Sequence, residues 1–163
     1  MNRPTRPPTP QPAPGVTAWL TSNGWTPDRD LGERAAELVE VRVRDAERQG
    51  VTLPPSPAAT RVVRAYGLLR LAHPKAAETW LMKPTLGYEG DAALIEELAA
   101  GLGVGLFPVG YEESERGIVL VDETGRWFQL HHTGGYFLGA DEHDAFSRFL
   151  GGVDAPDAEG WFV

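Results

Sequence analysis

Five carboxylates crowd into one short stretch of this sequence: Glu112, Glu113, Glu115, Asp122 and Glu123. Paired carboxylates can act as general acid and base, as in glycoside hydrolysis, when their surroundings separate their pKa values. Here they flank a predicted hairpin, and the sequence shows no apolar pocket around them. The pattern favours a solvated acidic rim, which could face a partner, over a catalytic pair.

The histidines and glycines offer little chemistry. His131 and His132 are adjacent, and neighbouring side chains on a strand point to opposite faces, so the two cannot share one metal without a bend. No His-Glu-x-x-His spacing occurs. The Gly101-x-Gly103-x-Gly105 run follows a predicted helix, whereas a dinucleotide-binding loop precedes one. The sequence therefore predicts no metal, no cofactor and no enzymatic activity.

Charge is distributed unevenly along the chain. The whole chain carries −8, but residues 85–163 hold three Arg and fifteen Asp or Glu, a formal charge of −12. Such a surface repels nucleic acid and anionic membranes and attracts basic proteins, so a basic nuclease or deaminase domain would suit it as a partner. The same acidity could instead serve solubility alone.

Length and composition limit the classes of protein to which this chain can belong. A chain of 163 residues suits one domain with its own core. No apolar run approaches the roughly 20 residues needed to span a bilayer, and the N-terminus lacks the apolar stretch of a secretory signal. There is no cysteine, which fits a reducing compartment. We therefore expect a cytoplasmic protein.

Periodicity and turn residues predict an α+β fold, with a mostly antiparallel sheet of four to six strands and helices packed around it. Residues 1–14 include six prolines and are expected to form a disordered tail. Ser56, Asp91 and Asp141 are predicted helix caps. Predicted helices cover residues 16–23, 30–49, 57–66, 91–100 and 142–150. Predicted strands cover residues 68–71, 78–82, 104–111, 117–121, 126–131 and 136–138.

Short motifs follow one another in a consistent order between residues 16 and 152. They are Gly24-Trp25 with Arg29, Tyr66-Gly67, Met82-Lys83-Pro84, Leu102-Gly103, Phe107-Pro108-Val109-Gly110, Asp122-x-x-Gly125-Arg126 and Gly139-x-Asp141. Together they resemble the SUKH superfamily, in particular its third group of bacterial immunity proteins. Trp127 and Tyr66 depart from the family pattern, but both are compatible with its fold.

The resemblance implies a SUKH-like domain over residues 15–152. It does not cover residues 153–163, whose composition predicts an acidic tail with an aromatic end. It also implies a protein that binds a cognate bacterial toxin stoichiometrically and neutralises it. A regulatory or scaffolding module of the same fold remains an alternative, and a small hydrolase is a further one. The residues expected to contact the partner are Tyr88, Tyr111, Glu112, Glu113, Glu115, Asp122, Glu123, Asp141, Glu142 and Asp144.

Overall fold

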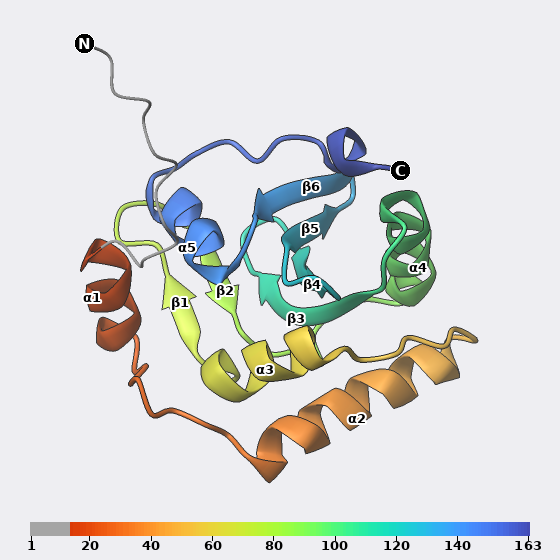
Figure 1. Ribbon diagram of the computed structural model, residues 1–163, viewed down its shortest axis with the longest axis horizontal. Coiled ribbons are helices and arrows are strands. Elements are labelled where there is room, and N and C mark those ends of the chain that lie inside the picture. The colour runs from red at the N-terminus through yellow and green to blue at the C-terminus, as the bar shows by residue number, and fades with distance from the viewer. Residues whose placement is uncertain (1–13) are drawn as a thin grey trace.

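The computed structural model describes residues 14–163, which form five α-helices, a six-stranded sheet and one 3-10 helix (Figure 1). The helices are α1 (Pro14–Ser22), α2 (Glu33–Arg48), α3 (Pro57–Tyr66), α4 (Asp91–Leu102), α5 (Glu142–Leu150) and the 3-10 helix η1 (Ala158–Trp161). The strands are β1 (Arg70–Ala72), β2 (Thr79–Leu81), β3 (Leu106–Glu112), β4 (Gly117–Asp122), β5 (Trp127–His131) and β6 (Gly134–Gly139). The predicted proline-rich tail lies outside the described residues, except for Pro14, which begins α1.

The sheet is an antiparallel meander in which each strand pairs with the next one along the chain. The predicted α+β fold with a mostly antiparallel sheet is confirmed. All six strands differ from their predicted limits by one or more residues, and the first and last strands are examples. The first starts at Arg70 because Leu68 has a φ of 68°, which is left-handed and not extended. The last is longer than the predicted residues 136–138.

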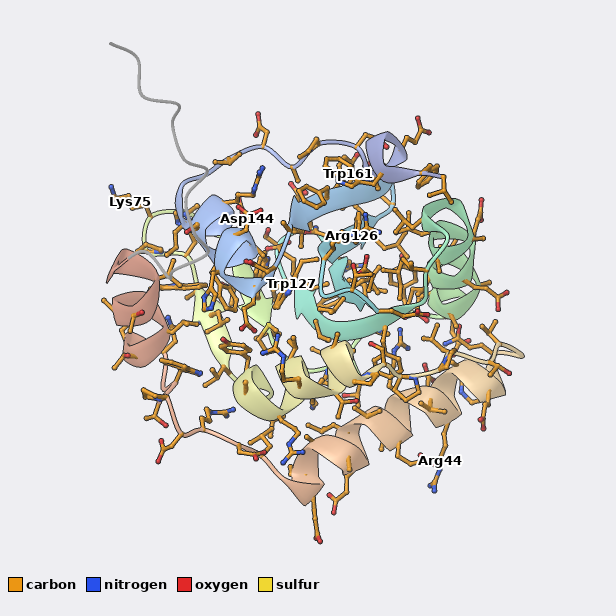
Figure 2. The ribbon with its side chains drawn as sticks, viewed as in Figure 1. Arg44, Lys75, Arg126, Trp127, Asp144 and Trp161 are labelled. Carbon is orange, nitrogen blue, oxygen red and sulfur yellow. The ribbon has the colours of Figure 1, made fainter. Side chains whose placement is uncertain are left out.

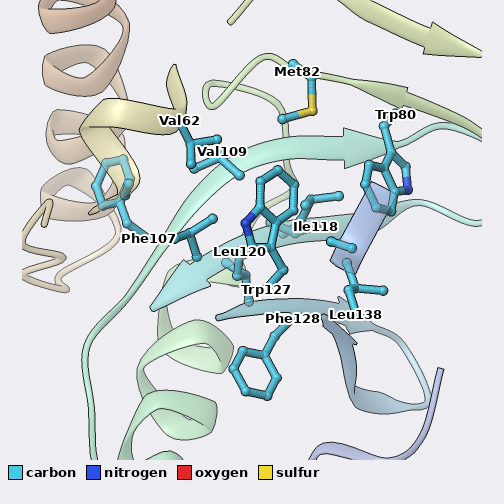
Figure 3. Packing of buried hydrophobic residues seen from close by; sticks show 14 of the residues in the cluster. Val62, Trp80, Met82, Phe107, Val109, Ile118, Leu120, Trp127, Phe128 and Leu138 are labelled. Carbon is cyan, nitrogen blue, oxygen red and sulfur yellow. The ribbon is translucent and has the colours of Figure 1, made fainter. Parts of the chain in front are cut away.

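Helices cover both faces of the sheet, as two consecutive residues of β5 illustrate. Trp127 is fully buried and meets Phe146 of α5 edge-on, with 5.3 Å between ring centroids. Phe128 points to the opposite face, beside α4 in Figure 3, and contacts Phe137 at 5.6 Å. Phe137 in turn stacks on Trp161 of η1 at 4.0 Å. Because both faces are covered, β3 and β4 are almost continuously apolar and do not alternate.

Local sequence signals fix two of the helix starts. The side chains of Ser56 and Asp141 each accept the backbone N–H three residues on, at 3.1 and 2.8 Å, as predicted. The prediction that Asp91 caps the fourth helix is wrong, because Gly90 occupies the cap position of α4 and Asp91 is the first helical residue. The carboxylate of Asp91 is therefore free to bond elsewhere.

The C-terminal segment, residues 153–163, is part of the packed fold, which differs from the acidic tail that the sequence suggests. The backbone N–H of Phe137 in β6 donates to the carbonyl of Pro156 at 2.8 Å. The last residue, Val163, donates its N–H to the carbonyl of Gly101 in α4 at 3.0 Å. The segment thus packs against both β6 and α4 and connects them (Figure 1).

Candidate functional site

The ten residues predicted to contact a partner do not share one surface. Glu112 ends β3, and the turn after it lies at one end of the sheet. β4 runs back along β3, so Glu123 lies at the opposite end. Trp127 pairs with Gly139, which places the start of α5, including Asp141, at this second end as well. The acidic residues therefore form two separate groups.

Glu112 is buried, and the expectation that it faces a partner is wrong. Its side chain is only 3% exposed. Its carboxylate accepts the backbone N–H groups of Thr79 (3.3 Å), Ser114 (3.0 Å) and Glu115 (2.7 Å), together with the Ser114 hydroxyl (2.6 Å). These bonds close the turn between β3 and β4 and tie it to β2, so Glu112 has a structural role.

Asp122 is also buried, and its predicted place on a contact surface is corrected for the same reason. One carboxylate oxygen accepts the backbone N–H groups of Thr124 and Arg126, both at 2.9 Å, and the Thr124 hydroxyl at 2.7 Å. The other accepts from Nε of Arg126 at 2.6 Å, and Figure 2 labels this arginine beside Trp127. Asp122 thus organises the turn between β4 and β5.

The remaining acids of the second group are engaged within the molecule. Glu123 accepts the backbone N–H of Gly105 at 2.9 Å. Glu142 is 12% exposed at its side chain and pairs with Arg61 of α3 at 3.2 Å. Asp141 caps α5, and Asp144 bonds Arg148 of the same helix at 3.0 Å. That these acids contact a partner stays a prediction, although each already has a bonding partner.

The turn between β3 and β4 carries the exposed acids of the first group, Glu113 and Glu115. Among residues 14–163, the side chain of Glu113 has one contact with a basic group, at 3.6 Å from Arg70, and that of Glu115 has one, at 3.5 Å from Nε2 of His131. Their side chains are 51% and 69% exposed, so these pairs contribute little to stability. These two carboxylates are available to a partner.

A hollow of about 400 Å³ opens beside this turn, and we call it the tyrosine hollow. It is lined by Gly87, Tyr88, Tyr111, Glu115, Arg116 and His132. The structure therefore brings both predicted tyrosine anchors and one predicted carboxylate to a single concave site. Tyr88 is 37% exposed, while Tyr111 is half-buried in β3. The pKa of Tyr88 is raised, mainly because the side chain is partly buried. The negative charge of Asp91 and the nearby Tyr111 raise it further, so the phenol stays neutral.

A buried ion pair holds the loop that carries Tyr88. Nη2 of Arg42 in α2 donates to Oδ2 of Asp91 at 2.7 Å, and the same oxygen accepts the backbone N–H of Tyr88 at 3.1 Å. Gly87 is required here, because a side chain at this position would collide with the Asp91 carboxylate and the Arg42 guanidinium. Sequence reasoning missed this pair. The available signal was Arg42 itself, an arginine within the apolar face of a helix.

The two adjacent histidines lie closer together than strand alternation predicts. β5 ends at His131, so His132 belongs to the following turn, and the two ring centroids are 3.9 Å apart. Within residues 14–163, no group of three His, Asp or Glu side chains is arranged to hold a metal ion. Over the same residues, no helix is long and apolar enough to cross a membrane.

Comparison with protein-family models matches residues 12–152 to the SUKH-3 immunity proteins. The chain belongs to the SUKH-3 immunity protein family. The resemblance inferred from the ordered motifs is therefore confirmed. Searches of curated proteins and of solved structures found no match. The SUKH-3 match ends at Gly152, so the packed segment 153–163 lies outside the matched residues.

Membership of the SUKH-3 family gives the geometry its functional context. The family is one of immunity proteins, which fits a surface for binding more closely than a catalytic centre. The buried carboxylates Glu112 and Asp122 have their oxygens occupied by turn donors. The tyrosine hollow, by contrast, offers aromatic and charged groups that are not committed to closing a turn.

Proposed function

We propose that this SUKH-3 protein binds a cognate bacterial protein toxin in a stoichiometric complex and neutralises it by covering or distorting the toxin's active site. The family match over residues 12–152 is the observation that carries this proposal. No covalent step is required of the immunity protein, because its action is binding. The toxin class that suits it best is a basic nuclease or deaminase domain, given the charge of −12 on residues 85–163.

The tyrosine hollow supports the proposal as the centre of the contact surface. Tyrosine is favoured at the centres of protein interfaces because it buries a large apolar ring and keeps a polar hydroxyl. Tyr88 presents such a ring on a loop that the Arg42–Asp91 pair holds in place. A rigid anchor loses little conformational entropy on binding, which favours tight association.

The exposed carboxylates beside the hollow support a role in encounter. Glu113 and Glu115 lie on the turn between β3 and β4, where solvent reaches both. Charges of this kind accelerate association with an oppositely charged partner and help to fix its orientation. An interface of standard size buries about 1,600 Å² in total, so it would extend beyond the hollow to neighbouring surface.

The direct test begins with the gene next to the one that encodes this chain: if it encodes a large secreted protein, the C-terminal domain of that protein is the toxin domain to be tested. We expect that domain and this protein to elute as a 1:1 complex in size-exclusion chromatography with light scattering. Expression of the toxin domain alone should stop bacterial growth, and co-expression of this protein should restore it. Failure to form a complex, with growth unrestored, would contradict the proposal.

A matched pair of variants locates the contact. Tyr88→Ala removes the exposed anchor, and we expect it to weaken toxin binding by about 2 kcal/mol, roughly thirtyfold, as for a central interface aromatic. Leu94→Ala removes a side chain of comparable exposure on α4 and serves as the control, since Leu94 lies outside the hollow. Equal affinities for the two variants would place the interface elsewhere.

A further inference from the structure

A second concave site, which we call the His131 cleft, lies on the other side of the same turn. It has a volume of about 350 Å³, near the lower end of the range for ligand pockets. The ends of β2, β5 and β6 form one wall, and α5 with residues 152–155 forms the other. Glu115 and the two histidine rings separate it from the tyrosine hollow, since His131 lines the cleft and His132 lines the hollow.

A glycine in β4 leaves room for a side chain that lines this cleft. Gly117 in β4 has no side chain, and a Cβ there would collide with the side-chain amide of Gln129 in β5. The Gln129 side chain therefore lies across the strand and lines the cleft with its polar end. Trp80 and Phe149, whose rings are 4.4 Å apart, supply the buried apolar lining (Figure 3 shows Trp80).

Polar groups surround the open side of the cleft. His131 Nδ1 lies 2.8 Å from the Thr133 hydroxyl, which lies 2.5 Å from the hydroxyl of Tyr136. These groups form a chain of hydrogen-bonding atoms along one side. His131 Nε2 approaches Glu115, whose carboxylate is mostly exposed. The cleft thus combines an apolar interior with acceptors at its mouth.

The net charge of the lining is negative. Four carboxylates contribute, namely Glu78, Glu112, Glu115 and Asp154, and the one arginine, Arg148, is paired with Asp144. Glu112 is occupied by the turn. Glu78 and Asp154, one on each wall, have exposed side chains with no ion pair or side-chain hydrogen bond among residues 14–163. The cleft therefore has a surplus of negative charge and an apolar interior.

We propose that the His131 cleft receives an arginine side chain of the toxin, an inference that rests on the proposed immunity function. The methylene stem of an arginine packs against Trp80 and Phe149, while its guanidinium meets Glu78, Glu115 and Asp154 at the mouth. A planar guanidinium carries five donors in a fixed fork and can bond to several carboxylates, whereas the ammonium of lysine is a compact point charge with three donors. An anionic group is disfavoured by the same carboxylates.

The first test uses a small probe in place of the toxin, namely arginine blocked at both termini as N-acetyl-arginine methylamide. Followed by NMR on the full chain, we expect saturable shifts at Gln129, Thr133 and Trp80, with a dissociation constant on the order of 1 mM. The citrulline analogue, which has the same shape and no charge, should give no saturable shift. Saturation by citrulline, or no saturation by arginine, would overturn the proposal, and tighter binding of blocked lysine would overturn the preference for arginine.

A pair of substitutions that neutralises two exposed carboxylates weakens the recognition without touching the folded core. Glu78→Gln combined with Asp154→Asn should weaken binding of the arginine probe about fivefold, because two exposed ionic contacts are lost. The control is Glu96→Gln with Glu97→Gln on α4, which makes the same change in net charge away from the cleft. Equal weakening by both pairs would show that only the overall charge matters and would overturn the proposed site.

The toxin itself separates this inference from the function on which it rests. If the wild-type protein forms the 1:1 complex and the Glu78→Gln/Asp154→Asn variant binds equally well, the cleft proposal fails and the immunity function stands. If the probe occupies the cleft but no toxin complex forms, the immunity function fails and the assignment to the toxin fails with it. A complex that the cleft variant weakens at least fivefold, with the control pair unaffected, supports both.

Discussion

Arg42 and Asp91 form an ion pair that is wholly removed from solvent and joins α2 to the start of α4, 49 residues later in the chain. Gln49 adds a bond of 3.1 Å to the same carboxylate, and Tyr88 donates its backbone N–H to it. A buried pair adds little net stability compared with apolar side chains, but the loss of one partner leaves an uncompensated charge. Its effect here is to fix the loop that presents Tyr88.

Asp91→Ala should therefore lower the free energy of unfolding by about 3 kcal/mol, near the low end for a broken buried pair because Arg42 keeps its bond to Asp45. Urea denaturation measures this loss. Glu89→Ala, which removes an exposed partner of Arg48, should change the midpoint little. The double substitution Arg42→Met/Asp91→Leu should be more stable than Asp91→Ala; a double variant that is less stable would contradict this account.

The two acids Glu112 and Glu115 are three residues apart, but neutralisation should destabilise the protein only at Glu112. Glu112→Gln replaces one acceptor oxygen with an amide donor that faces the N–H groups of the turn, so we expect a loss of about 1–3 kcal/mol. Glu115→Gln changes an exposed side chain and should leave the melting temperature nearly unchanged. Thermal unfolding followed by circular dichroism compares them, and equal shifts would mean that Glu112 is not the closing residue of the turn.

Signals that act over a few residues were readable from the sequence. The Ser56 and Asp141 caps and the antiparallel hairpin of β4 and β5 depend on such signals, and they were predicted. The Asp122-x-x-Gly125 turn was also predicted, but the burial of its carboxylate was not, because burial depends on how the folded chain packs around the strand end. Acidic residues are rarely buried unless paired, so exposure was the natural expectation for both Glu112 and Asp122.

Contacts between residues far apart in the chain could not be predicted from the sequence. No local pattern indicates that Asp91 pairs with Arg42, or that the segment after Gly152 returns to β6 and α4. The acidic residues that were expected on one contact surface lie in two groups at opposite ends of the sheet. The tyrosine anchors were proposed from residue type, and their convergence on one hollow arises from the tertiary fold.

The pKa of Asp30 tests whether its ion pair with Arg64 of α3 forms in solution. Two hydrogen bonds from Arg64, at 3.0 and 2.8 Å, together with the N–H of Gly32, lower the pKa of Asp30 from 3.8 to about 2. Because the folded pKa is depressed, this contribution to stability is present above pH 3.8 and is lost as the pH falls toward 2. NMR titration should show the low value in the wild type and a higher pKa in Arg64→Gln. A wild-type pKa near 3.8 would exclude the pair in solution.

Trp161→Ala tests whether the segment outside the matched residues stabilises the fold. Trp161 stacks on Phe137 at 4.0 Å and an interplanar angle of 13°. Because the ring is half-buried, we expect a loss of about 2 kcal/mol, below the 3–5 kcal/mol of a fully buried tryptophan. Phe162→Ala removes a neighbour that is 44% exposed and should cost less. If Trp161→Ala leaves the urea midpoint unchanged, the segment is an appendage and not part of the core.

Glu113 and Glu115 allow the steering role of charge to be separated from folding. Glu113→Lys with Glu115→Lys reverses two exposed charges on the turn and spares Glu112, which closes it. We expect the association rate with a basic toxin to fall about tenfold at low salt, and the difference from wild type to shrink as salt screens the charges. Stopped-flow mixing measures the rates.

The matched control for this reversal is Glu96→Lys with Glu97→Lys, which produces the same net charge from the exposed side of α4. If long-range attraction by the whole molecule dominates, both pairs slow association equally, because the overall field is what the toxin experiences. If the turn lies at the point of contact, the Glu113/Glu115 pair slows association more and also accelerates dissociation, since charges near an interface act on both steps. The dissociation rate therefore decides whether this turn, and with it the tyrosine hollow, is where the toxin binds.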